Sequence, residues 1–489
     1  MKKTILILVV LALLAPAGAL AATEFSLGGY IKLDSFWDST QEVKNMGTGI
    51  ARNNDQLFHH GRFNMTAQST RFNFTIKGPK LWGATTTGFI EMDFDANADG
   101  RQSSTQSYAP RLRHAMFRLN WPETELMFGQ YFTMFCEFGP DVVQDTPLNN
   151  HGMASARVPQ IRVTQKFAGA WTVAGAIMKP YDPSTADANF ENPPNAVINP
   201  GQVQYSPGTN TWPGQSSETP QLMGKIAYEK DLWGKAPFFG RPRGFTAQVT
   251  AGWQRTRYHS GSAAAVATGP FTFGQNAFGT ASITQGTQQY LDPWMVQANL
   301  FIPVLPTYSA NLAGTASLSA QWFIGQGLSA FGEAQDTDNS WFNFSGINGL
   351  GQFVYDRKLT NQFGGYVQGQ YWFTNQWFVN AVWAMQRSYG VETGASGLLA
   401  GKQAGNPFGY MYASNNDQTK LWQEFDLTLW YRPIEAIKFG LQYSYGRTDY
   451  FQKLNNPQIG AVGAQGQPSA GATNVGEAHR VEFVAFMFF

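Results

Sequence analysis

The feature that most constrains this chain is a two-residue alternation of apolar and polar side chains that recurs from end to end. It is clear in residues 25–34, 424–429 and 437–445, where one face is apolar or aromatic and the other carries Lys, Asp, Ser, Gln or Gly. Successive side chains of a β-strand point to opposite faces, so this pattern predicts half-buried strands. After the N-terminal segment, no stretch reaches the ~18 uninterrupted apolar residues of a transmembrane helix. If the chain spans a membrane, its strands must close into a barrel, because backbone groups in lipid need hydrogen-bond partners.

The first residues have the layout of a secretory signal peptide. Lys2 and Lys3 form a basic start, residues 5–14 are almost purely apolar, and Ala19 and Ala21 provide a small-residue cleavage site. We therefore expect residues 1–21 to be removed. Residues 22–489 are expected to form one domain.

The amino-acid composition favours a β-barrel whose outer face contacts lipid. Aromatic residues make up 15% of the chain, glycines number 51, and charged residues are only 14%, whereas a soluble domain usually carries about a quarter. Without Lys2 and Lys3 the mature chain has 32 basic against 33 acidic residues, a net charge of −1. This balance gives no electrostatic case for nucleic-acid binding. The single cysteine, Cys136, excludes a disulfide framework.

About sixteen segments show the strand pattern, and an even number is typical of bacterial single-chain barrels. The fold class predicted is all-β, a transmembrane antiparallel β-barrel. The expected strands are 25–37, 62–77, 84–95, 111–121, 125–132, 159–167, 170–178, 220–230, 244–257, 291–302, 314–325, 362–373, 376–387, 420–431, 436–449 and 479–489.

The connections alternate between short and long. Short ones include 122–123, 168–169, 374–375 and 432–435. Long ones, rich in Gly, Asn, Ser, Thr, Gln and Pro, are expected at 38–61, 96–110, 133–158, 179–219, 258–290, 326–361, 388–419 and 450–478. Short periplasmic turns and long extracellular loops are the signature of a multi-pass barrel in a Gram-negative outer membrane, with lipid and lipopolysaccharide as its surroundings.

Two further features fit a barrel of this kind. Aromatic residues near expected strand ends predict girdles at the membrane–water interfaces. These aromatic residues are Trp121, Trp171, Trp253, Trp372, Trp377, Tyr431 and Tyr443. The last expected strand finishes on Phe489, and a terminal aromatic residue is what barrel-insertion machinery typically reads.

Strand parity predicts which charged side chains face the lumen. An inward-folded loop three, at about 133–158, would lie beside them and narrow the pore, and a pore discriminates by the charges at its narrowest point. The expected basic wall consists of Lys32, Arg71, Arg157, Arg162 and Lys166. The expected acidic side consists of Asp34, Glu91, Asp93, Asp141, Asp145, Glu424 and Asp426. An alternative is that the arginines only anchor loop three through ion pairs.

Motifs for other chemistry are weak. Asp95, Asn97 and Asp99 match the opening of a calcium loop, but the flanks are expected strands and the twelfth position is Gln106, which favours a hydrophilic turn. We find no nucleophile elbow, phosphate loop or H-E-x-x-H motif, so we expect neither an enzyme nor a cofactor.

Short motifs resemble those of trimeric sixteen-strand outer-membrane porins, most closely the DcaP-like porin family. The motifs lie in the first third of the mature chain, at residues 29–34, 68–72, 111–117, 128–132 and 157–162. The resemblance implies a homotrimer and the uptake of small organic anions such as dicarboxylates.

These observations predict a porin for passive diffusion of small polar solutes, with a preference for anions. A barrel that sheathes a partner, such as a periplasmic electron carrier, would need a wider bore and no inward-folded loop three. A sugar-specific porin would need an aromatic slide, for which Tyr30, Tyr131, Trp422 and Trp430 are candidates.

Overall fold

The protein is described by a computed structural model. The described residues are 23–40, 50, 53, 60–95, 109–144, 148, 151–180, 217–264, 282–332, 340–347, 353–390, 419–454 and 473–489. The expected signal peptide, residues 1–21, lies outside them.

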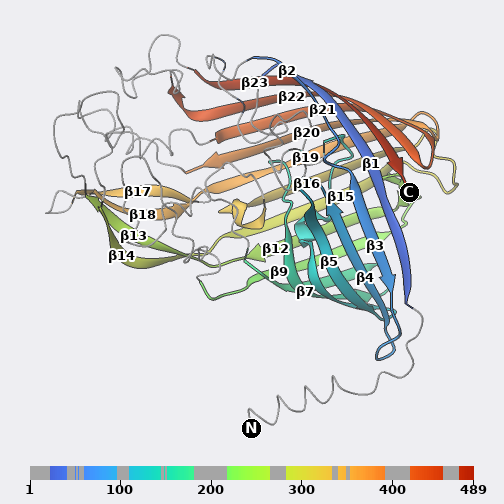
Figure 1. Ribbon diagram of the computed structural model, residues 1–489, viewed down its shortest axis with the longest axis horizontal. Helices are drawn as coiled ribbons and strands as arrows, with labels where there is room; N and C mark the ends of the chain where they lie inside the picture. Colours follow the sequence, from blue (N-terminus) through green and yellow to red (C-terminus); the bar gives the residue numbers. More distant parts are fainter. Residues whose placement is uncertain are drawn as a thin grey trace, which may run out of the picture.

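Sixteen antiparallel strands form one closed sheet (Figure 1). The second strand is broken, since β2 and β3 both pair with β1. The barrel strands are β1 (Glu24–Asp38), β2 (Arg62–Thr66) with β3 (Arg71–Lys77), β4 (Thr85–Asp93), β5 (Arg111–Asn120), β6 (Thr124–Phe132), β7 (Arg157–Phe167), β8 (Trp171–Met178), β9 (Gln221–Lys230), β12 (Phe245–Trp253), β15 (Trp294–Leu305), β16 (Ala316–Gln326), β19 (Asn361–Trp372), β20 (Trp377–Tyr389), β21 (Thr419–Ile434), β22 (Ile437–Leu454) and β23 (Thr473–Phe488).

Pairing between the first and last strands closes the barrel. β1 and β23 are in register from Tyr30 opposite Phe488 to Asp38 opposite Arg480. The backbone of Phe489 adds two hydrogen bonds of 3.2 Å with Gly29, one in each direction. Closure leaves no unpaired sheet edge, which is the condition for strands to cross a bilayer.

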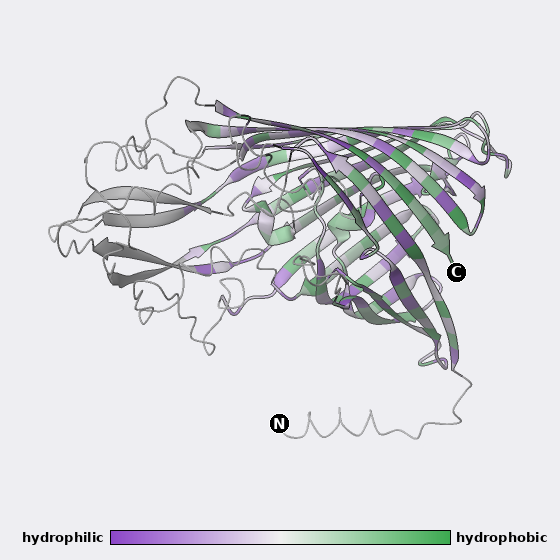
Figure 2. Cartoon of the chain, turned by 45° about the horizontal axis from the view of Figure 1, so that its top comes forward, coloured by the Kyte–Doolittle hydropathy of each residue, from purple (hydrophilic) through white to green (hydrophobic). Residues whose placement is uncertain are grey.

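The two faces of the wall differ in polarity, as β21 illustrates. Phe425, Leu427 and Leu429 are exposed on the outer face, whereas the intervening Glu424 and Asp426 are buried inside the barrel. Hydropathy alternates along the barrel strands in the same way (Figure 2). An apolar exterior of this kind matches the hydrocarbon of a membrane.

The predicted fold class is confirmed. Each of the sixteen expected segments overlaps one barrel strand, and the largest differences are the break at residues 67–70 and longer strands toward the loop end. One girdle expectation is wrong: Trp372 is buried and stacks on Phe378 with the ring centroids 4.1 Å apart. Its side chain points inward because strand parity places Tyr371 and Phe373 on the outer face.

Several short elements were not expected. A two-stranded hairpin, β10 (Ala236–Phe238) with β11 (Arg241–Arg243), lies in the connection between β9 and β12. A separate four-stranded sheet is made of β13 (Thr256–Ala264), β14 (Ser282–Leu291), β17 (Ser340–Ile347) and β18 (Phe353–Leu359). Two 3-10 helices are η1 (Met134–Glu137) and η3 (Leu328–Phe331). In the described part of the chain, no helix is long and apolar enough to cross a membrane.

Close backbone packing at Gly365 provides a test of how tightly β19 packs against β16 in the barrel wall. Its φ is 153°, and a Cβ there would lie 2.0 Å from the carbonyl oxygen of Gln321 on β16. We expect Gly365→Ala to lower barrel stability by about 1–3 kcal/mol, the usual cost of overpacking. The measurement is the temperature at which the folded, heat-modifiable band is lost on a gel. Gly369→Ala on the same strand is the matched control, because a Cβ there meets no atom within 4 Å. Equal transition temperatures for the two variants would contradict the described packing.

Candidate pore lining

Loop three, residues 133–156 between β6 and β7, is held against the inner wall by backbone hydrogen bonds to side chains of distant strands. The Asp141 N–H donates to the Gln368 side chain on β19 (2.7 Å), and the Val143 N–H donates to Gln442 on β22 (3.0 Å). Gln297 on β15 donates to the Phe135 carbonyl at 2.9 Å. The loop therefore runs along the inside of the barrel.

Ion pairs hold the two carboxylates of the described part of the loop. Lys225 on β9 contacts Glu137 at 2.6 Å, and the guanidinium of Arg162 lies 3.6 Å from the same carboxylate. Lys438 on β22 contacts Asp141 at 3.2 Å. The charges of Glu137 and Asp141 are thus balanced locally by the wall on which this part of the loop rests.

Apolar contacts add to this attachment. Phe135 packs against Phe331 of η3 with ring centroids 5.6 Å apart, and both rings are fully buried. Further along the loop, His151 stacks on Trp422 of β21 at 4.7 Å. Loop three therefore contacts the lumenal side of the wall from β9 to β22, and its Val143 carbonyl also accepts a 2.8 Å hydrogen bond from Lys32 on β1.

The remaining space is a cavity of about 690 Å³ between loop three and the first strands. Its lining includes two carboxylates, Glu137 and Asp141, and six basic residues. The basic residues are Lys32, Arg71, Arg111, Arg113, Arg157 and Lys438.

Carboxylates lie behind the basic side chains and hold them in place. Arg113 contacts Glu91 at 2.8 Å and Asp93 at 2.5 Å, while Arg111 contacts Asp93 at 2.7 Å. Arg71 lies 3.7 Å from Glu91. Charge-assisted pairs of this geometry fix long side chains in one orientation. The result is a preorganised basic surface along one wall of the cavity.

The structure places three of the expected basic residues in the cavity lining and two outside it. Lys32, Arg71 and Arg157 line the cavity, whereas Arg162 and Lys166 are outside its lining. Arg162 is buried and donates to the Phe132 carbonyl and to Gln160, at the base of loop three. Its position is that of an anchor for the loop.

The expected acidic residues are also divided. Asp141 lines the cavity. Asp34 is paired with Lys32 at 2.7 Å, so it lies with Glu91 and Asp93 on the basic wall rather than opposite it.

Glu424 and Asp426 lie behind loop three. Glu424 accepts a hydrogen bond from Gln144 of the loop at 2.9 Å, and Asp426 accepts one from Gln442 at 3.1 Å. Asp145 lies outside the described residues.

Sequence reasoning did not include Arg111, Arg113 and Lys438 in the pore lining. The signal was present, because Arg111 and Arg113 are two residues apart and share a face of β5. Lys438 lies between the outward-facing Ile437 and Phe439, so parity also directs it inward.

The structure places only some of the residues behind the weaker sequence signals. Asp95 is paired with Arg111 at 3.1 Å, while Asn97 and Asp99 of the calcium hypothesis lie outside the described residues. Over the residues that the structure describes, no cluster of three metal-ligating side chains occurs. Cys136 lines the cavity beside Ser155, with the sulfur 3.5 Å from its hydroxyl oxygen, and burial raises the pKa of the thiol.

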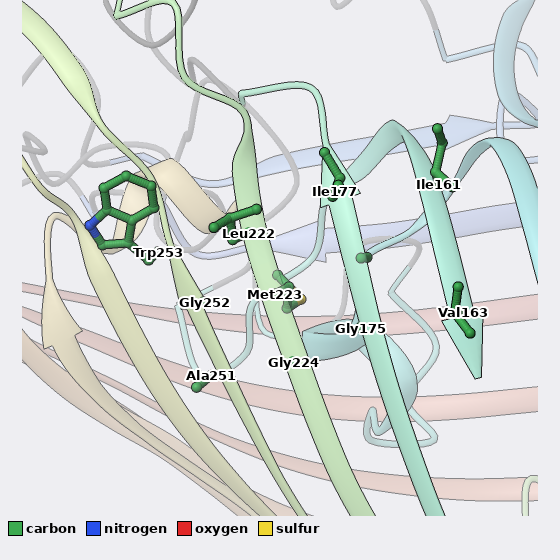
Figure 3. A pocket seen from close by; sticks show the side chains of 11 residues that line it. Ile161, Val163, Gly175, Ile177, Leu222, Met223, Gly224, Ala251, Gly252 and Trp253 are labelled. Carbon is green, nitrogen blue, oxygen red and sulfur yellow. The ribbon is translucent and has the colours of Figure 1, made fainter. Parts of the chain in front are cut away.

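A second depression lies on the outer face of the wall, on β7, β8, β9 and β12. Figure 3 shows its rim, including Ile161, Ile177 and Leu222, and the small residues Gly175 and Gly224 at its floor. Its rim residues are exposed and apolar. This depression faces the surroundings of the barrel and is separate from the lumen.

Comparisons with known proteins agree with this architecture. No family model matches the sequence, and no curated protein matches it significantly. In fold, the chain is similar to the outer membrane channel DcaP of Acinetobacter baumannii, with a TM-score of 0.56 and 15% identity over 97% of this chain and 100% of that one. The chain therefore has the fold of a porin-like β-barrel.

Weaker likenesses are to other porins. The anion-selective porin from Comamonas acidovorans has a TM-score of 0.45 and 9% identity, covering 96% of this chain and 100% of that one. OmpF of Salmonella typhi has a TM-score of 0.45 and 12% identity, covering 95% and 97%. The resemblance to sixteen-strand porins is confirmed at the level of the fold by the likeness to the DcaP channel.

The anchoring position of Arg162 in this porin-like barrel can be tested. We expect Arg162→Ala to increase fluctuations of the open-channel current, because loop three loses contacts at its base. The reversal potential in a salt gradient should change less than in Arg157→Ala, because Arg157 lines the cavity. A larger change in ion preference for Arg162→Ala would assign Arg162 to the pore surface instead.

Proposed function

We propose that this barrel is a channel for passive diffusion and that it prefers small organic anions. The observation that carries the proposal is the charge of the cavity lining, where six basic residues meet two carboxylates. Both carboxylates are already engaged by Lys225, Arg162 and Lys438. Five of the six basic residues are paired as well, with Asp34, Glu91, Asp93 or Asp141. The positive surface that an entering anion meets at the narrowed part of the lumen therefore comes from the excess of basic over acidic groups.

The chemistry of the wall favours carboxylate-bearing solutes. Arg71, Arg111 and Arg157 come from three different strands and surround one cavity. Guanidinium groups pair with carboxylates through two parallel hydrogen bonds, and several such groups around one space suit a solute with two carboxylates. We therefore include dicarboxylates among the proposed solutes.

Loop three favours this proposal over the sheath alternative. A barrel that encloses a partner protein needs an open bore, whereas loop three occupies the lumen from β9 to β22. For a sugar-specific pore, Tyr30 and Trp430 line the cavity but Trp422 is covered by His151. A continuous aromatic slide has less support than the basic wall.

A homotrimer is the oligomeric state that we propose, on the basis of the resemblance to trimeric porins. Its mass in detergent, measured by light scattering, provides the check.

Ion selectivity in planar bilayers tests the proposed function. Under a potassium chloride gradient, we expect the reversal potential of the wild-type channel to have the sign of anion selectivity. A unit charge at about 4 Å is worth ~1 kcal/mol even in water, so Arg71→Gln should lower the anion-to-cation permeability ratio several-fold. Removal of Arg71 leaves Glu91 paired with Arg113, which preserves the wall.

The matched control is Arg255→Gln, which removes the same charge outside the cavity. Arg255 lies between β12 and β13, is paired with Asp292 at 2.8 Å and is 41% exposed in its side chain. The control should retain the wild-type permeability ratio. A cation-selective wild-type channel would refute the proposal, and equal effects of the two variants would refute the role of the basic wall.

A further inference from the structure

The connection between β9 and β12 carries a hairpin that turns back into the barrel. β10 contacts the inner side of β15 and β16, where Ala236 is fully buried and the Pro237 carbonyl accepts a hydrogen bond from Ser317 at 3.3 Å. Phe238 packs on Phe301 of β15 with ring centroids 5.4 Å apart. The hairpin is thus docked inside the lumen, at the end of the barrel that carries the short turns.

The hairpin is also joined to loop three. Phe138 of the loop is fully buried and lies 5.4 Å from the Phe238 ring. The guanidinium of Arg243 lies over both rings, at 4.6 Å from Phe138 and 4.8 Å from Phe238. Arg243 is itself held by a 3.0 Å hydrogen bond to Glu229 at the end of β9. Two segments that enter from opposite ends of the barrel therefore form one packed unit.

The tip of the hairpin has an unusual residue. Phe239 and Gly240 are the two central residues of the turn, with φ values of 50° and 72°, a pattern of a type I′ turn. Asn, Asp and Gly are favoured at the first position, whereas a bulky residue with positive φ costs on the order of 1–3 kcal/mol. Phe239 is nevertheless there, is 51% exposed, and lines the same cavity as the basic residues.

We propose that the hairpin is a second constriction element and that Phe239 sets the size limit of the pore. This inference rests on the proposed channel function and adds a specificity-determining residue to it. Loop three and the basic wall select by charge, whereas the Phe239 ring narrows the same path without adding charge. Charge selection and size selection are therefore carried by different side chains.

Single-channel recording of Phe239→Gly provides the direct test. Glycine suits the turn conformation, so the hairpin should keep its fold while the ring is lost. We expect higher conductance and admission of larger neutral polyethylene glycols, together with an unchanged reversal potential. An unaltered conductance and an unaltered polymer size limit would overturn the inference.

Trp82→Gly is a matched control. Trp82 and Gly83 form the turn between β3 and β4 with φ values of 50° and 80°, and Trp82 is 74% exposed outside the cavity lining. This variant loses an aromatic ring at the same turn position, so it should keep the wild-type conductance and size limit. If it matched Phe239→Gly, the effect would belong to turn stability rather than to the pore.

Thiol labelling adds a second measurement that does not depend on the glycine variant. In a Cys136→Ser background the described cavity has no other thiol, since the chain has one cysteine. A methanethiosulfonate reagent should then reduce the current through Phe239→Cys channels. Absence of block, in channels that conduct, would show that position 239 is outside the conduction path. Failure of the wild-type chain to conduct at all would instead refute the proposed function.

Discussion

The structure depends on the requirement that every backbone polar group in a bilayer has a hydrogen-bond partner. Sixteen strands meet that requirement only when β1 pairs with β23, which the chain achieves from Tyr30 through Asp38. Closure also creates an interior that must be filled or solvated. The alternation that presents Phe425 and Leu427 to lipid brings Glu424 and Asp426 inside, so the polar lumen is a direct consequence of the apolar exterior.

Loop three narrows this lumen. Its carboxylates Glu137 and Asp141 are balanced by Lys225 and Lys438 on the wall that it covers. The opposite wall keeps its arginines, which carboxylates behind them hold in position. The predicted transverse field, with acids facing bases across the pore, is replaced in the described residues by a basic wall that faces a loop with its charges already paired.

Sequence reasoning predicted the fold well because a single local rule, the two-residue period, applies to every barrel strand. The same rule identified Lys32 and Arg71 as inward-facing residues, and it would have added Arg111 and Lys438 if it had been used to choose lining residues on β5 and β22. It could not separate a lining residue from an anchor. Arg162 and Glu424 face inward as parity requires, but loop three covers them, and the path of a loop depends on contacts with strands far away in the chain. The β10–β11 hairpin was missed for a different reason, because three-residue strands have too few positions to show a period.

The anchors of loop three have a consequence for assembly. Its partners Gln368, Asn380 and Gln442 follow their loop residues by 227, 239 and 299 positions. The anchoring of loop three is therefore complete only when the last third of the polypeptide has joined the sheet. Before those strands are in place, loop three has its contacts with β9 and β15 but lacks those with β19 and β22. Insertion of the last strands and closure of the barrel in a single step would avoid an intermediate whose lumen is not narrowed by a fully anchored loop three.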